Sequence, residues 1–185
     1  DTLSLHDALP ICCIPSKCLL HTSHLFYLSK NDFTKFGINM DSVDFDLDSV
    51  MKYKHARVQE LGKGIEYLFN MNGVKPIKGF AKIISFDQGL FSLSVSGSTL
   101  LQSKKVVLAT GSETSPLQGI PFDEKFIVSS SSAINFNEVP SSLVVIGAGA
   151  IGLEMASVWS RLGSEVTVIE FADRIASFLD KDLGQ

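Results

Sequence analysis

The stretch from residue 143 to residue 170 constrains the fold of this chain more than any other. Residues 143–146 are a run of four apolar residues, which predicts a buried strand. The run leads directly into Gly-Ala-Gly-Ala-Ile-Gly at residues 147–152. Apolar residues then recur at helical spacing, at Ile151, Met155, Val158 and Leu162. A second apolar run at 166–169 ends at Glu170, so the sequence predicts one βαβ unit with parallel strands.

Each glycine of this Gly-x-Gly-x-x-Gly pattern has a physical role. Gly147 permits a tight turn out of the strand, and Gly149 lacks a Cβ, so that a pyrophosphate can approach the backbone. Gly152 allows the helix to pack closely against the sheet. The free N–H groups and the positive end of the helix dipole would then face the phosphates. The pattern favours dinucleotide binding, and a tight turn in another kind of α/β sheet is the alternative.

Glu170 adds a preference between two nucleotides. It follows Gly147 by roughly 20 residues, the spacing at which an acid accepts hydrogen bonds from the ribose hydroxyls. A carboxylate at that place would repel a 2′-phosphate. The sequence therefore favours NAD over NADP.

Composition narrows the class of protein. The chain has 185 residues, of which 45% are hydrophobic, enough for a globular core of one large domain or parts of two. Its net charge of −4 disfavours a nucleic-acid partner, and no apolar run is long enough to span a bilayer. Three cysteines in a chain of this length argue against a secreted disulfide scaffold and favour a reducing, intracellular compartment.

A second candidate site lies near the start of the chain. Residues 12–29 predict a helix with Pro15 in its first turn, and Cys13 comes just before that helix. The helix dipole and Lys17 would both favour the Cys13 thiolate, as in a reactive cysteine. A small buried hydrophobe is the commoner role of a cysteine and the better interpretation of Cys18. A disulfide between Cys13 and Cys18 is disfavoured, because five helical steps separate them by roughly 7.5 Å along the axis.

The middle of the chain predicts one long helix and then strands. Residues 46–71 carry an apolar helical stripe, with Asp46 or Asp48 as the N-cap. We predict strands at 74–84, 91–95 and 106–109, with turns at 87–89 and 96–98. The last of these strands, expected to be buried, meets Ala-Thr-Gly-Ser at 109–112, where a glycine lets backbone approach a ligand. A loop-rich connector at 113–140 holds the expected domain boundary.

Three separated stretches together resemble one family. Cys-Ile-Pro-Ser-Lys at 13–17, Val-Leu-Ala-Thr-Gly-Ser at 107–112 and the residues at 147–154 are similar to dihydrolipoamide dehydrogenases, which are pyridine nucleotide–disulfide oxidoreductases. The resemblance runs from about residue 12 to the C-terminus. Glutathione and mercuric reductases share the architecture. Ile14, where those enzymes usually have valine, and Glu170 favour the lipoamide branch.

The resemblance implies an α/β fold in two parts. Residues 12–112 would be a partial FAD-binding domain of helices, a β-meander and a strand of a parallel sheet. Residues 113–185 would begin a Rossmann-type NAD-binding domain with its first βαβ unit. The family works as a homodimer in the mitochondrial matrix or the bacterial cytoplasm, with no nucleic-acid or membrane partner.

The resemblance also implies a reaction. Electrons pass from dihydrolipoamide to a cysteine pair, then to FAD and then to NAD⁺. The dihydrolipoamide is carried on lipoyl domains of the 2-oxo-acid dehydrogenase complexes and of the glycine cleavage system.

Site residues follow position by position. Cys13 matches the redox cysteine that lies against the flavin. Contacts to FAD are implied for Lys17, Ala81, Thr110, Gly111 and Ser112. Contacts to NAD are implied for Gly147, Ala148, Gly149, Ala150, Ile151, Gly152, Leu153, Glu154 and Glu170.

The chain departs from the family near its start. The family's first redox cysteine lies five residues before the second, where this chain has Ala8, and Cys12 replaces a glycine. The 185 residues also lack the family's first FAD fingerprint and its C-terminal His–Glu pair. We therefore expect residues 1–11 to be a non-family or artefactual segment and the chain to be an inactive piece of an enzyme. The alternatives are a non-catalytic NAD-binding remnant and a related reductase of the mercuric or glutathione type.

Overall fold

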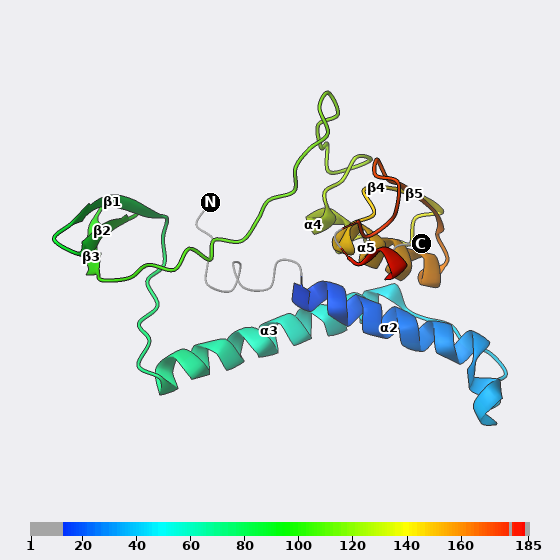
Figure 1. Cartoon of the computed structure of the whole chain (residues 1–185). Coiled ribbons are helices and arrows are strands. Elements are labelled where there is room, and N and C mark those ends of the chain that lie inside the picture. The colour runs from blue at the N-terminus through cyan, green and yellow to red at the C-terminus, as the bar shows by residue number, and fades with distance from the viewer. Residues whose placement is uncertain (1–12, 178, 184–185) are drawn as a thin grey trace. The chain divides into compact units, whose positions relative to one another are not determined.

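The computed structural model describes residues 13–177 and 179–183, which form two compact units (Figure 1). One unit is residues 60–115, and the other combines residues 13–59 with residues 116–183. The helices and strands are α2 (Cys13–Asn31), η1 (Phe33–Phe36), α3 (Leu47–Met71), β1 (Ala81–Asp87), β2 (Leu90–Val95), β3 (Thr99–Ser103), α4 (Ser130–Ala133), β4 (Ser142–Ile146), α5 (Ala150–Leu162), β5 (Glu165–Ile169) and η2 (Lys181–Leu183).

The predicted βαβ unit is present. Strands β4 and β5 pair in parallel, with Leu143 opposite Val166 and Val145 opposite Val168. Helix α5 connects them and contacts both strands. Its C-terminus is closed by Gly163 in the left-handed conformation, which lets the chain turn back into β5. The fold prediction is thus confirmed for this part of the chain, and the whole is a mixed α/β structure.

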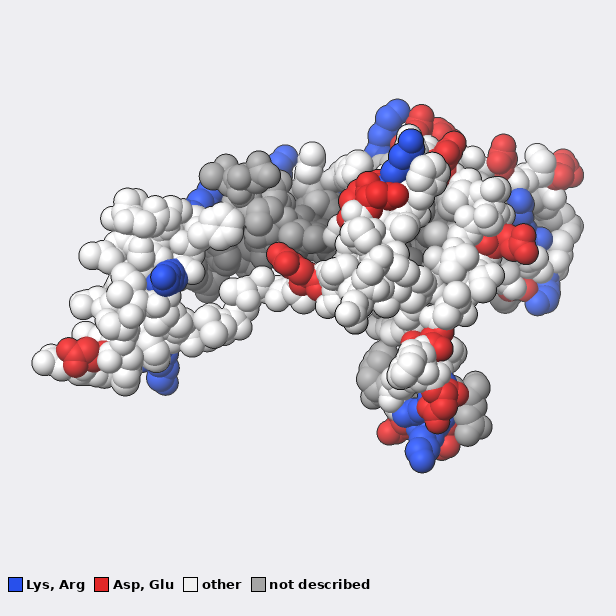
Figure 2. All heavy atoms as spheres, turned by 90° about the horizontal axis from the view of Figure 1, so that it is seen from above, with Lys and Arg blue, Asp and Glu red and all other residues white. Residues whose placement is uncertain are grey.

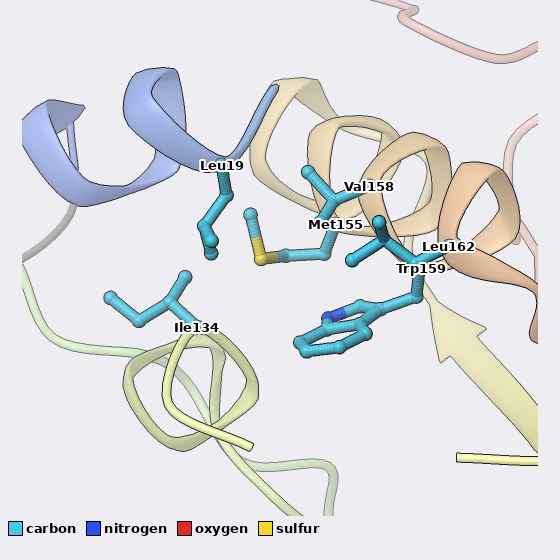
Figure 3. Packing of buried hydrophobic residues seen from close by; sticks show 6 residues of the cluster. All are labelled: Leu19, Ile134, Met155, Val158, Trp159 and Leu162. Atoms are coloured by element: carbon cyan, nitrogen blue, oxygen red, sulfur yellow. The ribbon is translucent and has the colours of Figure 1, made fainter. Parts of the chain in front are cut away.

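Figure 3 shows how α5 is held in its unit. Its buried face meets Leu19 from α2 and Ile134, which follows α4, in one hydrophobic cluster. The side chains that α5 gives to this cluster are Met155, Val158, Trp159 and Leu162. Full burial of such a side chain stabilises a fold by roughly 1.5–3 kcal/mol, so this cluster fixes α2 against α5.

Helix α3 begins where the sequence predicts. The Asp46 carboxylate accepts hydrogen bonds from the Asp48 N–H (3.0 Å) and the Ser49 hydroxyl (2.5 Å). These bonds satisfy groups at the helix start and lower the pKa of Asp46, with the Ser49 hydroxyl as the main cause. Asp46, rather than Asp48, is the cap.

The unit of residues 60–115 contains an antiparallel meander in the order β1-β2-β3. Its turns lie at Gln88-Gly89 and Ser96-Gly97, close to the predicted positions, and all four of these residues have positive φ. The first strand starts at Ala81, later than predicted, and the strand after the second turn is β3.

The prediction of a buried strand at 106–109 is wrong. These residues have no regular secondary structure, and Val107 and Leu108 are 87% and 74% exposed. An apolar run becomes a strand only when a neighbouring strand accepts its hydrogen bonds. Among the described residues of this unit, the strands are those of the meander, and none of them pairs with 106–109. The parallel-sheet strand expected in the first domain is therefore not formed.

Charged side chains of both signs are scattered over the face of the molecule that Figure 2 shows. Most of this face is uncharged, and neither sign of charge forms a large continuous patch on it. This distribution accords with the small net charge of −4. Among the described residues, no helix combines the length and the apolar character that a membrane span requires.

Candidate functional site

The glycine-rich loop joins β4 to α5 in the way that the sequence predicts. Gly147 takes a φ of +101°, a conformation that strains other residues, and its N–H donates to the Ile169 carbonyl at the end of β5 (2.8 Å). Gly149 is the N-cap of α5, and its carbonyl accepts the first helical hydrogen bond from Leu153 (3.0 Å). The loop therefore turns sharply and delivers the chain to the helix N-terminus.

The three glycines differ in what surrounds them. A Cβ placed on Gly152 would lie only 2.1 Å from the Gly147 carbonyl oxygen, so only glycine fits where the helix packs on the loop. A Cβ placed on Gly149 would meet no atom within 4 Å. The backbone at Gly149 is thus open to a ligand, next to the amides of Ala150 and Ile151 in the first turn of α5. This arrangement fits a pyrophosphate group.

Glu170 lies against the loop. One carboxylate oxygen accepts from the Ala148 N–H (2.6 Å) and the other from the Ala172 N–H (2.8 Å). These backbone hydrogen bonds, from Ala172 first and then Ala148, lower the pKa of Glu170 and keep it charged. A negative charge is therefore fixed beside the loop. Sequence reasoning predicted the acid but missed both backbone bonds, because no residue type marks them.

The other candidate group is the first turn of α2. Cys13 is exposed at the start of the helix. The Lys17 ammonium pairs with the carboxylate of Glu154 in α5 (2.5 Å), and the Ser16 hydroxyl donates to the other oxygen of that carboxylate (3.1 Å). The structure thus joins two residues that the sequence assigned to different cofactors. Nothing in the sequence marks this pair, because its members are far apart in the chain.

Cys18 differs from Cys13 in its surroundings. It is half-buried, and burial raises the pKa of its thiol, with Lys54 and Arg57 acting in the opposite direction. This supports the interpretation of Cys18 as a packing residue. Both cysteines of the described chain are free thiols, as the helical spacing predicts.

The remaining predicted flavin contacts lie in the unit of residues 60–115. Ala81 opens β1 opposite Val95, and Thr110, Gly111 and Ser112 are exposed in an irregular segment. Gly111 has a φ of +77°, which suits glycine, with open space around its Cβ position. Their role as cofactor contacts stays a prediction. Among the described residues, no cluster of His, Cys, Asp or Glu could hold a metal ion.

The sequence matches the family described as pyridine nucleotide-disulphide oxidoreductase over residues 8–185. The chain belongs to this family. Proteins of the family typically bind FAD and NAD, and the open glycine loop with its fixed acid fits the second of these. The division into domains at residue 113 stays a prediction, and residues 1–11 lie outside the described residues.

Several curated relatives are similar over most of this chain. Mitochondrial dihydrolipoyl dehydrogenase 1 of Arabidopsis thaliana is 47% identical over 171 residues, which are 92% of this chain and 34% of that protein. Leghemoglobin reductase of Vigna unguiculata is also 47% identical, over 92% of this chain and 33% of its own. Mitochondrial dihydrolipoyl dehydrogenase of Dictyostelium discoideum is 44% identical, over 94% of this chain and 36% of that protein. The chain spans about a third of the length of these relatives.

Solved structures agree on the fold. LpdA of Mycobacterium tuberculosis matches with a TM-score of 0.80 at 19% identity, over 95% of this chain and 39% of that chain. The flavoprotein disulfide reductase RclA of Escherichia coli matches with a TM-score of 0.68 at 26% identity, over 93% of this chain and 35% of that chain. The likeness to LpdA shows that the chain shares the mixed α/β fold of part of that structure.

Proposed function

We propose that this chain is part of a dihydrolipoyl dehydrogenase that passes electrons from dihydrolipoamide, through a cysteine pair and FAD, to NAD⁺. The observation that carries the proposal is the open glycine loop with the Glu170 carboxylate fixed beside it. The 47% identity to a relative named dihydrolipoyl dehydrogenase supports the substrate class. Its dihydrolipoamide would be carried by lipoyl domains of 2-oxo-acid dehydrogenase complexes and of the glycine cleavage system.

Different residues of the site would hold different parts of NAD. The open backbone at Gly149 and the first-turn amides of α5 would hold the pyrophosphate. Glu170 would accept hydrogen bonds from the ribose hydroxyls and exclude a 2′-phosphate. When bound, FAD would supply the two-electron carrier between thiols and nicotinamide, and NAD⁺ the final hydride acceptor.

The first turn of α2 would supply the thiol and its charged neighbour. Cys13 is an exposed free thiol at the helix start, and the family resemblance gives it the role of the redox cysteine that lies against the flavin. Lys17, held by Glu154, would carry a positive charge close to that thiol and to the flavin. Position 8 holds alanine instead of the partner cysteine, so we expect the 185-residue chain itself to be inactive.

The relatives also guide location and assembly. Those from Arabidopsis, Dictyostelium and other eukaryotes carry mitochondrial names, so a mitochondrial parent protein is favoured over a bacterial one. The family resemblance supports a homodimer for that parent. Glu170 argues against an NADP-linked reductase of the glutathione or mercuric type, and Ala8 is what supports a non-catalytic NAD-binding remnant.

Steady-state reduction of NAD⁺ by dihydrolipoamide, measured on the parent gene product, tests the proposal. We expect activity that Cys13→Ser abolishes, whereas Cys18→Ser, the matched control at a half-buried thiol, retains it. Absence of activity in the parent, with NAD still bound, would leave the non-catalytic remnant as the better account. A preference for NADPH would identify a reductase of the other type.

A further inference from the structure

The residue in the middle of the glycine loop is held on both of its main-chain groups. Ala148 is 1% exposed, although it lies in a turn between a strand and a helix. Its N–H donates to Glu170 Oε2 (2.6 Å), and its carbonyl accepts from the Ala176 N–H (2.9 Å). Both partners come from the segment that follows β5. We call these two hydrogen bonds the Ala148 brace.

The segment that supplies the brace is itself fixed. The second oxygen of Glu170 accepts from the Ala172 N–H (2.8 Å), and Arg174 Nη2 donates to the Ser177 carbonyl (2.7 Å). Ala176 is buried and takes a φ of +46°, in the left-handed region that strains a residue with a Cβ. The surrounding contacts must offset this strain. Residues 170–177 therefore form a closed turn that can hold the loop in place.

We propose that Glu170 is a positioning residue for the glycine loop, in addition to any contact with ribose: through the Ala148 brace it holds the loop in its binding conformation before a nucleotide arrives. The inference rests on the proposed function, since it assumes that the loop binds NAD. The two roles of Glu170 are compatible. The two carboxylate oxygens offer about four lone-pair sites, so the backbone N–H groups of Ala148, Ala172 and Phe171 leave one free for a ribose hydroxyl.

Positioning of the loop should matter for binding, because the residues on either side of Ala148 have high conformational freedom. Ala148 stands between Gly147 and Gly149, and glycine loses more conformational freedom on ordering than any other residue. Fixing Ala148 from outside removes that cost from the binding step, which is how preorganisation improves affinity. A hydrogen bond to a charged carboxylate is stronger than one to a neutral group, so the bond to Glu170 is the main support of the brace.

Amide hydrogen exchange of the ligand-free 185-residue chain tests the brace directly. Exchange at Ala148 is read at single-residue resolution by mass spectrometry. We expect the Ala148 N–H to be protected, and Glu170→Ala to speed its exchange by at least about tenfold. Glu165→Gln is the control, because Glu165 is an exposed acid at the start of β5, the strand that Glu170 follows. Emission from Trp159, the single tryptophan, buried in the core, shows that each variant is folded. Equal Ala148 exchange in wild type and folded Glu170→Ala would overturn the inference.

A nucleotide without ribose hydroxyls separates the two roles of Glu170. ADP and 2′,3′-dideoxy-ADP are titrated into the wild-type chain and into Glu170→Ala. If Glu170 only contacts the hydroxyls, the variant binds dideoxy-ADP as well as wild type does, and the inference is wrong. If it positions the loop, the affinity for dideoxy-ADP also falls, by about threefold to tenfold. A wild-type chain that binds neither ADP nor NADH contradicts the proposed function, while hydrogen exchange still decides on the brace.

Discussion

Lys54 is the most unusual single residue outside the candidate site. Its side chain is only 1% exposed, and its ammonium donates to the Ile134 carbonyl and to Asn135 Oδ1, each at 2.6 Å. It thereby ties α3 to the connector that leads toward β4. Burial lowers the pKa of Lys54, with a smaller opposing effect from Cys18. The charge is therefore held in place by polar neutral groups at a cost in desolvation.

This cost predicts a particular dependence of stability on pH. Between the lowered pKa of folded Lys54 and the ordinary value of 10.5, the unfolded chain binds more protons at this site than the folded chain does. The free energy of unfolding of wild type should therefore rise, relative to Lys54→Met, as pH increases through that window. Urea unfolding of both proteins at a series of pH values up to 10.5 measures the difference. A fall with increasing pH would show that burial does not dominate at Lys54.

At the scale of elements, the glycine loop at the start of α5 is the centre of the proposed nucleotide site. The same glycine pattern contains one position fixed by packing, Gly152, and one open to solvent, Gly149. The same substitution by alanine can therefore be compared at two glycines of one pattern that differ in their surroundings. Alanine at position 152 tests the packing of the helix on the loop, and alanine at position 149 tests the approach of a ligand to the backbone.

Gly152→Ala should destabilise the chain by about 1–3 kcal/mol, because its Cβ would overlap the Gly147 carbonyl and the gain in helix propensity is smaller. Gly149→Ala should change stability by no more than about 1 kcal/mol, since its Cβ enters open space and an N-cap accepts alanine at modest cost. Its expected effect is on NADH affinity, which should fall at least about tenfold. Denaturant unfolding and calorimetric titration measure the two quantities. Equal loss of stability in both variants would contradict the assigned roles.

Sequence reasoning succeeds for these elements where the information is local. The β4–α5–β5 unit and the Asp46 cap depend on residues near one another in the chain, and they were predicted close to their observed positions. Sequence reasoning fails where the structure of a segment depends on a partner far away in the chain. Residues 106–109 are apolar enough for a strand but have no partner among the described strands, and the pairing of Lys17 with Glu154 joins residues that no periodicity connects. The Ala148 brace belongs to the same class, because backbone amides leave no mark in a sequence.

At the scale of the whole molecule, the chain spans about a third of the length of its relatives. One face of its β4–β5 pair is exposed. The face of the β4–β5 pair opposite α5 carries Val144, Ile146 and Ile169, which are 59%, 58% and 51% exposed in the described part of the chain. Neighbouring apolar side chains of this size form a surface on which proteins associate. This surface lies next to the strand ends that support the glycine loop.

The 185-residue chain should therefore bind a fluorescent apolar dye such as ANS and associate as its concentration rises. The double variant Val144→Thr, Ile146→Thr should reduce both effects while leaving Trp159 emission unchanged, because both side chains are exposed and threonine suits a strand. Val145→Thr is the control: it faces α5, so it should lower stability instead. Dye fluorescence and sedimentation measure the outcome, and unchanged dye binding in the double variant would contradict the prediction.

We propose that the glycine loop and Glu170 form an NAD site, and a comparison of NADH and NADPH binding tests this proposal most directly. Titration calorimetry on the 185-residue chain should show NADH binding at least about tenfold more tightly than NADPH, because the charged carboxylate repels a 2′-phosphate. Glu170→Ala should narrow that ratio. Equal affinities in wild type, or tighter binding of NADPH, would contradict the account.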